Sequence, residues 1–532
     1  MDTTDPNGLS RRQLLSMIGK IGGGTAMYHA MMSMGLAAQS TYQGPIRLQG
    51  AKPGASVVIL GAGLAGMIAA HELRRAGYQV QILEYQNRVG GRVWTVRGGD
   101  RITEMDGTTQ TVQFAPGNML EVGAWRVPYH HAGLLDYYRE FGVELEPFNQ
   151  FNNNTYLHDS QAFGGKPKRY REVMSDVRGH VSELLAKATS QGALDQAVTV
   201  ADKESLLANL KAWGVLDNQY RYVKSRAVSN RRGFAVSPAG GQMAKPEPSE
   251  PIGLSDLLSS KLWGHLGVFD EMLTQSVMFV PKGGMDRLTE AMGQSLNGVI
   301  RLNSRVTQIA QSDSAVTVRF EDTREPGKSQ EVRADWCVCT LPATILAQMD
   351  IQVNNQMRMA LRNLPYTSAF RVGLEFNRRF WEDDERIYGG VTYTDLPIQQ
   401  ISYPSYNYMK KGPAVLLGAY AVNTTNAFTF SSMTPSERMR VALEYGAQIH
   451  PQYKQEFRNG FSMAWHRIPW MLGCRAFWAE DMRRQHYDHL TPIDGRIVLA
   501  GEHVSYVEGW QEGAVLSSLD AIQRLQAKAT AV

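Results

Sequence analysis

Three glycines near the start of the chain have the spacing of a phosphate-binding turn. Gly61, Gly63 and Gly66 form the pattern G-x-G-x-x-G directly after an apolar run. The first glycine allows a tight turn, the second lets the backbone approach a pyrophosphate, and the third lets a helix pack closely on the strand. We therefore predict a dinucleotide site whose first contacts are Gly61, Ala62, Gly63, Leu64, Ala65 and Gly66.

An acidic and a basic group extend this site. Glu84 ends the next apolar run, about 20 residues after the turn, where a carboxylate can accept a hydrogen bond from a ribose 2′-hydroxyl. Its charge would repel a 2′-phosphate. The segment Arg88-Val-Gly-Gly-Arg92 follows at once, and glycines beside a guanidinium suit a second close approach of the backbone to the pyrophosphate.

A third candidate group is Arg126, which lies between Trp125 and Pro128 in an otherwise apolar, glycine-containing segment. A guanidinium that points into a pocket can bind a carboxylate through two parallel hydrogen bonds. The same residues also fit a surface arginine that stacks on a loop. The residues alone leave both readings open.

Strands and helices must hold these groups in place. Ser56–Leu60 and Tyr78–Leu83 are predicted to be buried strands, and Leu64–Ala76 the helix between them. The N-terminus of that helix offers free N–H groups and partial positive charge to phosphates. Near the C-terminus, strand Arg496–Ala500 and a glycine-rich turn around Trp510 lead into another helix, which repeats this arrangement.

Length and composition limit the classes of protein that fit. A chain of 532 residues needs two or three domains. Its net charge of +4 is small for this length and does not suggest a nucleic-acid partner. Three cysteines cannot form a disulfide framework, and no cysteine or histidine cluster has zinc spacing, so we predict no metal.

Four stretches of the chain resemble the flavin amine oxidase family, and among its members the L-amino-acid oxidases. They are Gly61–Arg92, Gly123–Pro128, Thr394–Pro404, and Ala500 to His503 with its continuation to Ala514. The resemblance implies FAD as the cofactor, bound without a covalent link. Residues that it assigns to FAD, beyond the first turn, are Glu84, Arg92, Gly123, Ala124, Trp125, Val306, Gly501, Glu502, Trp510 and Gln511.

The resemblance also implies roles around the substrate. Arg126 would pair with the substrate carboxylate, and Tyr403 would donate its hydroxyl to the same group. Gly509 would offer a backbone carbonyl to the amine, and Trp510 would flank the substrate beside the flavin. Oxidases of simple amines do not need such a carboxylate clamp, so this pair favours an amino acid as substrate.

Two positions depart from the family pattern. Where the family places a lysine on a strand beside the flavin, this chain has Arg371. An arginine cannot be deprotonated at working pH, which excludes a role for a neutral amine there. Cys474 resembles the position at which monoamine oxidases attach FAD, but its spacing to Gly501-Glu502 is shorter, and a plain buried thiol is the preferred reading.

These observations predict an α/β (α+β) two-domain flavoprotein, with a Rossmann-like FAD-binding domain, a mixed-sheet substrate domain and an inserted helical domain. The expected segments alternate along the chain: a signal segment (1–45), FAD-binding domain (46–120), substrate domain (121–150), helical insertion (151–260), FAD-binding domain (261–345), substrate domain (346–488) and FAD-binding domain (489–532).

The expected activity is oxidative deamination of an L-amino acid by FAD and O₂, giving a 2-oxo acid, ammonia and hydrogen peroxide. Alternatives are a primary amine or monoamine oxidase of the same fold, a flavin L-amino-acid monooxygenase, and a quinone-linked dehydrogenase. A flavin-carrying protein without catalysis fits worst. The sequence identifies no general base and does not indicate which substrate side chain is preferred. A homodimer is the default expectation for a soluble enzyme.

The first forty residues predict export. Ser10-Arg11-Arg12-Gln13-Leu14-Leu15 resembles a twin-arginine signal, and the stretch from Ile21 to Ala38 contains no charged side chain. We expect a periplasmic or secreted protein without stable membrane association. A retained membrane anchor and a basic tail are the alternatives.

Overall fold

A computed structural model describes residues 42–531. A five-stranded parallel sheet with the order β14-β2-β1-β18-β25 forms one half of the body. Its strands are β1 (Ser56–Leu60), β2 (Gln79–Leu83), β14 (Ile300–Arg301), β18 (Trp336–Cys339) and β25 (Ile497–Leu499). They come from all three segments predicted for the FAD-binding domain. Long crossovers join them, as parallel strands require.

Two helices from opposite ends of the chain pack on this sheet. Helix α2 (Leu64–Arg75) follows β1, and α16 (Gln511–Ala531) follows β25. Both bury apolar side chains in one core cluster, which holds Met67, Leu73 and Ile522 among others. The Ser518 hydroxyl also donates to the carbonyl of Ala65, at 2.8 Å. The strand–turn–helix predictions at both ends are thus confirmed.

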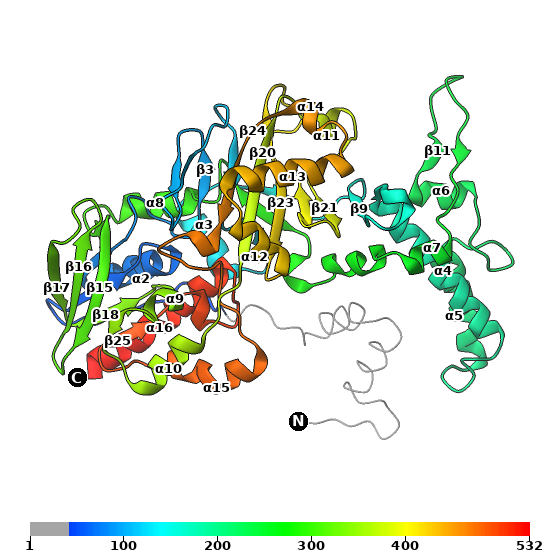
Figure 1. Ribbon diagram of the computed structural model, residues 1–532. Helices are drawn as coiled ribbons and strands as arrows, with labels where there is room; N and C mark the ends of the chain where they lie inside the picture. The colour runs from blue at the N-terminus through cyan, green and yellow to red at the C-terminus, as the bar shows by residue number, and fades with distance from the viewer. Residues whose placement is uncertain (1–41, 532) are drawn as a thin grey trace.

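A seven-stranded mixed sheet forms the other half, above the parallel sheet in Figure 1. In spatial order it contains β10 (Lys168–Arg169), β9 (Tyr156–His158), β21 (Val391–Thr394), β22 (Gln400–Ser402), β23 (Ala414–Val422), β20 (Ala369–Phe376) and β24 (Phe457–Ala464). Helices α12 (Thr425–Ser432) and α13 (Pro435–Ile449) cover it, and an aromatic core fills the interface. The mixed sheet expected for substrate binding is therefore present.

The helical insertion projects away from both sheets as an arm (Figure 1). It contains α4 (Tyr170–Ser190), α5 (Val200–Gly214), α6 (Arg226–Arg232) and α7 (Leu254–Ser259). Between α6 and α7 the chain forms a short antiparallel hairpin of β11 (Phe234–Val236) and β12 (Glu247–Pro248). Strands β9 and β10 fall within the predicted insertion, yet they join the seven-stranded sheet.

Smaller sheets complete the body. Strands β15 (Ser304–Gln311) and β16 (Val316–Asp322) form an antiparallel hairpin, with β17 (Ser329–Ala334) and β19 (Asp350–Ile351) on its two sides. Strand β13 (Met278–Pro281) lies between β7 (Val127–Pro128) and β8 (Leu145–Phe148). The other strands are β3 (Thr95–Arg97), β4 (Arg101–Thr103), β5 (Thr109–Thr111) and β6 (Met119–Glu121).

Further helices surround these sheets: α3 (Ala132–Glu140), α8 (Arg287–Ser295), α9 (Ala343–Leu346), α10 (Asn355–Asn363), α11 (Phe380–Asp383), α14 (Tyr453–Glu456) and α15 (Glu480–Leu490). Within residues 42–531, no helix combines the length and the apolar character needed to cross a bilayer. The predicted export signal lies outside the described residues.

Candidate active site

A cavity of about 1260 Å³ joins the two halves of the molecule. It begins beside the carboxyl ends of β1, β2 and β18 and continues to the face of the seven-stranded sheet. Open α/β sheets bind their ligands at this edge. Its walls include Gly61, Gly63, Glu84, Arg92, Gly123, Trp125, Arg126, Arg371, Tyr393, Tyr420, Glu502 and Trp510. Most of the predicted site residues therefore meet in one space.

The glycine turn has the geometry that its spacing predicts. Gly61 adopts a positive φ of 97°. A Cβ on Gly66 would lie 2.0 Å from the carbonyl oxygen of Gly61, so any side chain there would push the helix off the turn. By contrast, a Cβ on Gly63 would meet no atom within 4 Å. Gly63, Leu64 and Ala65 form cavity wall at the N-terminus of α2, while Gly66 lies behind it.

Glu84 connects the turn to the end of β2. One carboxylate oxygen accepts from the backbone N–H of Ala62 at 2.7 Å, and the other from that of Gln86 at 2.9 Å. Burial nonetheless raises the pKa of this carboxyl. Each oxygen keeps a lone pair, and the side chain lies in the cavity wall, so an acceptor is available at the position predicted for the ribose.

Arg92 and Glu502 are held by each other. A guanidinium nitrogen of Arg92 lies 2.6 Å from Glu502 Oε1, and Glu502 Oε2 accepts from the backbone N–H of Gly509 at 2.8 Å. Burial would raise the pKa of Glu502, but the charge of Arg92 and these hydrogen bonds keep it below its usual range. The pair fixes the Gly509 loop against the segment after β2. Contacts of both residues with FAD stay predictions.

The next segment approaches this pair through its backbone. A Cβ on Gly123 would lie 1.7 Å from the carbonyl oxygen of Arg92, which explains why a glycine is needed there. Gly123, Ala124 and Trp125 all lie in the cavity wall. Trp125 contacts Phe148 and Tyr420 edge-on, with ring centroids 5.5 and 5.6 Å apart.

Arg126 points into the cavity rather than over a surface loop. Its guanidinium carbon lies 4.4 Å from the centre of the Trp125 ring and 5.5 Å from that of Trp510. Its Nε is buried and has no hydrogen-bond partner among the described residues. Burial lowers the pKa of Arg126, and the titratable groups that also influence this pKa are Tyr420, Tyr393 and Arg371. No carboxylate of residues 42–531 is among these groups. The guanidinium of Arg126 is therefore available to bind an anionic ligand.

Arg371 is a second cation in the same wall. Its guanidinium donates to the carbonyl of Glu121 at 2.7 Å and lies 4.6 Å from the Tyr420 ring centre. The residue is nearly fully buried on β20. Its presence in the cavity agrees with the register by which it replaces the family's lysine.

The C-terminal turn contributes the opposite wall. Trp510, Gly509, Gly501 and Gln511 all line the cavity just before and at the start of α16. The Trp510 ring contacts His131 edge-on at 5.3 Å. The side-chain oxygen of Gln511 is buried and has no partner among the described residues. The contact of this wall with the flavin stays a prediction.

The predicted role of Tyr403 does not fit the structure. Its side chain is 1% exposed and lies outside the cavity, where the hydroxyl hydrogen-bonds with His450 Nε2 at 2.6 Å and Thr392 Oγ1 at 2.9 Å. Alternate residues of a strand face opposite sides. Gln400 of β22 faces the cavity, while Ile401 and Tyr403 belong to the aromatic core behind the sheet.

Two other predicted residues need comment. Val306 on β15 is not part of the cavity wall, which at this end is formed by Glu84, Tyr85 and Gln86. The FAD contact that the resemblance assigns to Val306 therefore gains no support. Cys474 does line the cavity, and burial raises the pKa of its thiol. A raised thiol pKa disfavours the reactive thiolate, in line with a non-covalent flavin.

Sequence reasoning missed the residues that close the substrate end: Gln150, His265, Tyr393 and Tyr420. Tyr393 and Tyr420 lie in stretches that are strand-like in sequence, but the register that turns their rings toward the cavity follows only from the sheet pairing. His265 belongs to a 3₁₀ segment just after the predicted insertion, Leu262–Phe269. No motif marks it.

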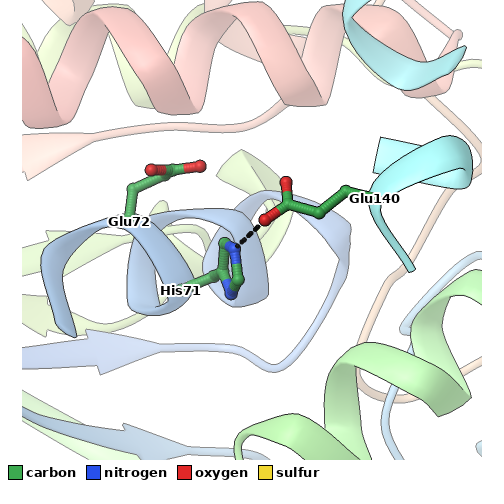
Figure 2. Close-up of side chains that lie close together, drawn as sticks. All are labelled: His71, Glu72 and Glu140. Atoms are coloured by element: carbon green, nitrogen blue, oxygen red, sulfur yellow. Dashed lines mark hydrogen bonds and ion pairs between the residues drawn. The ribbon is translucent and has the colours of Figure 1, made fainter. Parts of the chain in front are cut away.

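One polar cluster lies away from the cavity (Figure 2). His71 Nε2 is 3.0 Å from Glu140 Oε1, and Glu72 accepts a hydrogen bond from Tyr137. The guanidinium of Arg75 lies 3.1 Å from Glu140 and 3.7 Å from Glu72. It supplies these carboxylates with the positive charge that a metal ion would otherwise provide. The cluster fits an ion-pair network, and the absence of a metal stays a prediction.

Comparison with known proteins agrees with this geometry. The chain is 27% identical to the putative L-amino-acid oxidase YobN of Bacillus subtilis over 480 residues, covering 87% of this chain and 93% of the relative. It is 27% identical to the flavin-dependent L-tryptophan oxidase RebO of Lentzea aerocolonigenes, covering 88% and 98%. It is 28% identical to an L-amino-acid oxidase of Siganus canaliculatus, covering 87% and 84%.

Solved structures show the same fold. Cyclohexylamine oxidase from Brevibacterium oxydans matches with a TM-score of 0.59 at 16% identity, over 90% of this chain and 99% of that one. A putrescine oxidase variant matches with a TM-score of 0.58 at 19% identity, over 91% and 100%. The model of the flavin containing amine oxidoreductases matches residues 64–525. The chain belongs to this family and is an FAD-dependent flavoenzyme.

Proposed function

We propose that this flavoenzyme oxidises L-α-amino acids to 2-oxo acids, with release of ammonia and hydrogen peroxide. The observation that carries the proposal is Arg126, whose guanidinium lines the cavity without a carboxylate partner in residues 42–531. A buried cation without a counter-ion is costly. A bound substrate carboxylate removes that cost, whereas a simple amine adds a further positive charge beside Arg126 and Arg371.

The residues around Arg126 suit a ligand with an anionic head. Trp125 and Trp510 lie on the guanidinium and limit its movement, so its donors stay directed into the cavity. Both nitrogens of one guanidinium edge can then donate to the two carboxylate oxygens. Fixing the carboxylate fixes the orientation of Cα, which brings the reacting bond close to its acceptor before reaction.

The reaction itself needs little from side chains. The chemistry supplied by FAD, when bound, is removal of a hydride from Cα of the neutral amine and transfer of the two electrons to dioxygen. The glycine turn, Glu84 and the N-terminus of α2 would hold its dinucleotide part, while Trp510 and the Gly509 loop would border the substrate. The imino acid then reacts with water, which forms the 2-oxo acid and releases ammonia.

Anaerobic reduction of the holoenzyme tests this proposal. The loss of flavin absorbance is followed with a panel of L-amino acids, their D forms and the matching decarboxylated amines. Oxygen is then admitted, and hydrogen peroxide, carbon dioxide and any amide product are measured. We expect reduction by L forms, stoichiometric peroxide and no amide product. Reduction by the amines alone would make the chain an amine oxidase, release of carbon dioxide together with formation of the amide would make it a monooxygenase, and absence of peroxide would favour a dehydrogenase.

A further inference from the structure

Gln150 presents an unused hydrogen-bond acceptor in the substrate half of the cavity. Its side chain is 2% exposed and lines the cavity. The amide nitrogen donates to the hydroxyl of Tyr393 at 3.4 Å, while the amide oxygen is buried and has no partner among the described residues. A buried acceptor left without a donor costs free energy, so a ligand donor at this position would stabilise the complex.

The acceptor lies on a continuous path from Arg126. The positive charge of Arg126 acts on Tyr393, whose pKa burial raises to about 12 against this influence. Tyr393 in turn contacts Gln150. The amide also follows directly after β8, whose Phe148 packs on Trp125 beside Arg126. A ligand held at its carboxylate by Arg126 therefore extends its other end toward Gln150.

The walls along this path are aromatic. Trp125 and Tyr420 meet edge-on at 5.6 Å, and His265 stacks on Tyr393 with centroids 5.6 Å apart and planes 20° apart. Burial lowers the pKa of His265, which keeps its ring neutral at neutral pH. Aromatic faces favour a flat ring over an aliphatic chain.

The charges of this region select against basic side chains. Arg126, Arg371 and Lys261 line it and would repel a lysine or arginine side chain. Asp395, the carboxylate in this part of the wall, is already engaged, since its oxygens accept from the backbone N–H and the hydroxyl of Ser160 at 2.8 Å each. The cations would attract a carboxylate side chain, but an ionised carboxylate has no hydrogen to donate to the amide oxygen of Gln150. A neutral donor is left.

We propose that Gln150 selects amino acids whose aromatic side chain carries a neutral hydrogen-bond donor at its far end, the indole N–H of tryptophan or the phenol O–H of tyrosine. Its amide oxygen accepts from that donor, while Tyr393 holds the amide in place. This inference rests on the proposed function, since it takes the ligand's carboxylate to lie at Arg126.

Pairs of substrates that differ in one donor test the role of Gln150. The holoenzyme is reduced anaerobically by L-tyrosine and L-phenylalanine, and by L-tryptophan and 1-methyl-L-tryptophan. We expect the donor-bearing member of each pair to have a reduction rate per Kd about tenfold higher or more, because its partner leaves the buried acceptor unsatisfied. In Gln150→Met, which lacks the acceptor at similar volume, both ratios should fall to about one.

Binding provides a second readout that is independent of turnover. Calorimetry of the holoenzyme with 3-(4-hydroxyphenyl)propanoate and 3-phenylpropanoate should show the same preference and its loss in Gln150→Met. Gln150→Glu, which keeps an acceptor, should retain a preference for the donor. Gln161→Met, the same replacement at an exposed position outside the cavity wall, should leave all ratios unchanged.

The outcomes separate the two proposals. If L-amino acids reduce the flavin but the donor pairs are used equally, or if the preference persists in Gln150→Met, Gln150 does not select the side chain and the proposed function stands. If only tyramine and phenethylamine reduce the flavin, the proposed function itself fails, and this inference fails with it.

Discussion

The two ends of the cavity are built by different means. At the dinucleotide end, one continuous segment supplies the turn, the helix N-terminus and Glu84, which accepts from the backbone N–H of Ala62. At the substrate end, side chains from separate segments converge: Arg126 after β6, Gln150 after β8, His265 after α7 and Tyr393 on β21. The first end depends on close backbone packing, and the second on the register of distant strands.

This difference predicts opposite responses to mutation. A small side chain added at a glycine of the dinucleotide end should prevent FAD binding, because it would clash with a main-chain atom that cannot move away. At the side-chain-built end, single replacements should change which molecule reacts while leaving FAD bound. The following predictions test that contrast.

The largest effect is expected for Gly66→Val. Even the Cβ alone would lie 2.0 Å from the carbonyl oxygen of Gly61, so α2 must shift away from the phosphate turn. Clashes of this severity cost above about 4 kcal/mol, and we expect purified protein without flavin. The ratio of flavin to protein absorbance measures this. Gly240→Ala, at a position where a Cβ meets no atom within 4 Å, should keep full FAD content, and a flavin-loaded Gly66→Val would contradict the argument.

Arg126→Gln should leave FAD in place but lower turnover of L-amino acids. Loss of one partner of a buried, hydrogen-bonded charge pair costs about 2–5 kcal/mol, which lowers the rate per Kd of the amino acid about thirtyfold or more. Turnover of the matching decarboxylated amine should change little. Arg139→Gln, at an exposed position on α3, is the control. An equal loss for both substrate types would show that Arg126 supports the fold rather than the carboxylate.

Glu502→Gln should lower the stability of the fold, because Glu502 connects Arg92 to the Gly509 loop. Removal of its charge leaves Arg92 without its partner, and breaking a buried pair costs about 3–5 kcal/mol; we expect the low end because Arg92 is partly exposed. Thermal unfolding of the variant at neutral pH measures this loss. Glu480→Gln, an exposed carboxylate on α15, should leave stability unchanged.

The same residue predicts a pH dependence. The folded-state pKa of Glu502 lies below its unfolded value, so its stabilising effect is complete above the unfolded pKa, near 4.3, and is lost as pH falls through the folded pKa. Wild type should therefore lose stability more steeply than Glu502→Gln on acidification below about pH 4. Parallel curves would mean that the carboxyl gains nothing from Arg92.

The sequence predicts the backbone-built end almost completely, since glycine spacing and strand–helix patterns are local. Gly61, Gly63 and Glu84 all lie where these patterns place them. The substrate end was predicted at Arg126 and Trp510 only through the resemblance. The role predicted for Tyr403 was wrong because a shift of one residue in a strand moves a side chain to the other face of the sheet. Gln150 and His265 carry no local signal, since only the tertiary fold brings them to the cavity.

The smallest effect is expected for Tyr403→Phe, which tests this register directly. The lost hydroxyl bridges Thr392 and His450 in the core behind the sheet, and His450 continues to Glu385 at 2.7 Å. Its removal leaves a buried ring nitrogen without a partner, which costs about 1–3 kcal/mol of unfolding free energy. Because the cavity does not include this hydroxyl, FAD content, turnover and side-chain preference should stay at wild-type values. A selective loss of amino-acid turnover at unchanged stability would instead place Tyr403 at the substrate carboxylate and contradict the observed strand register.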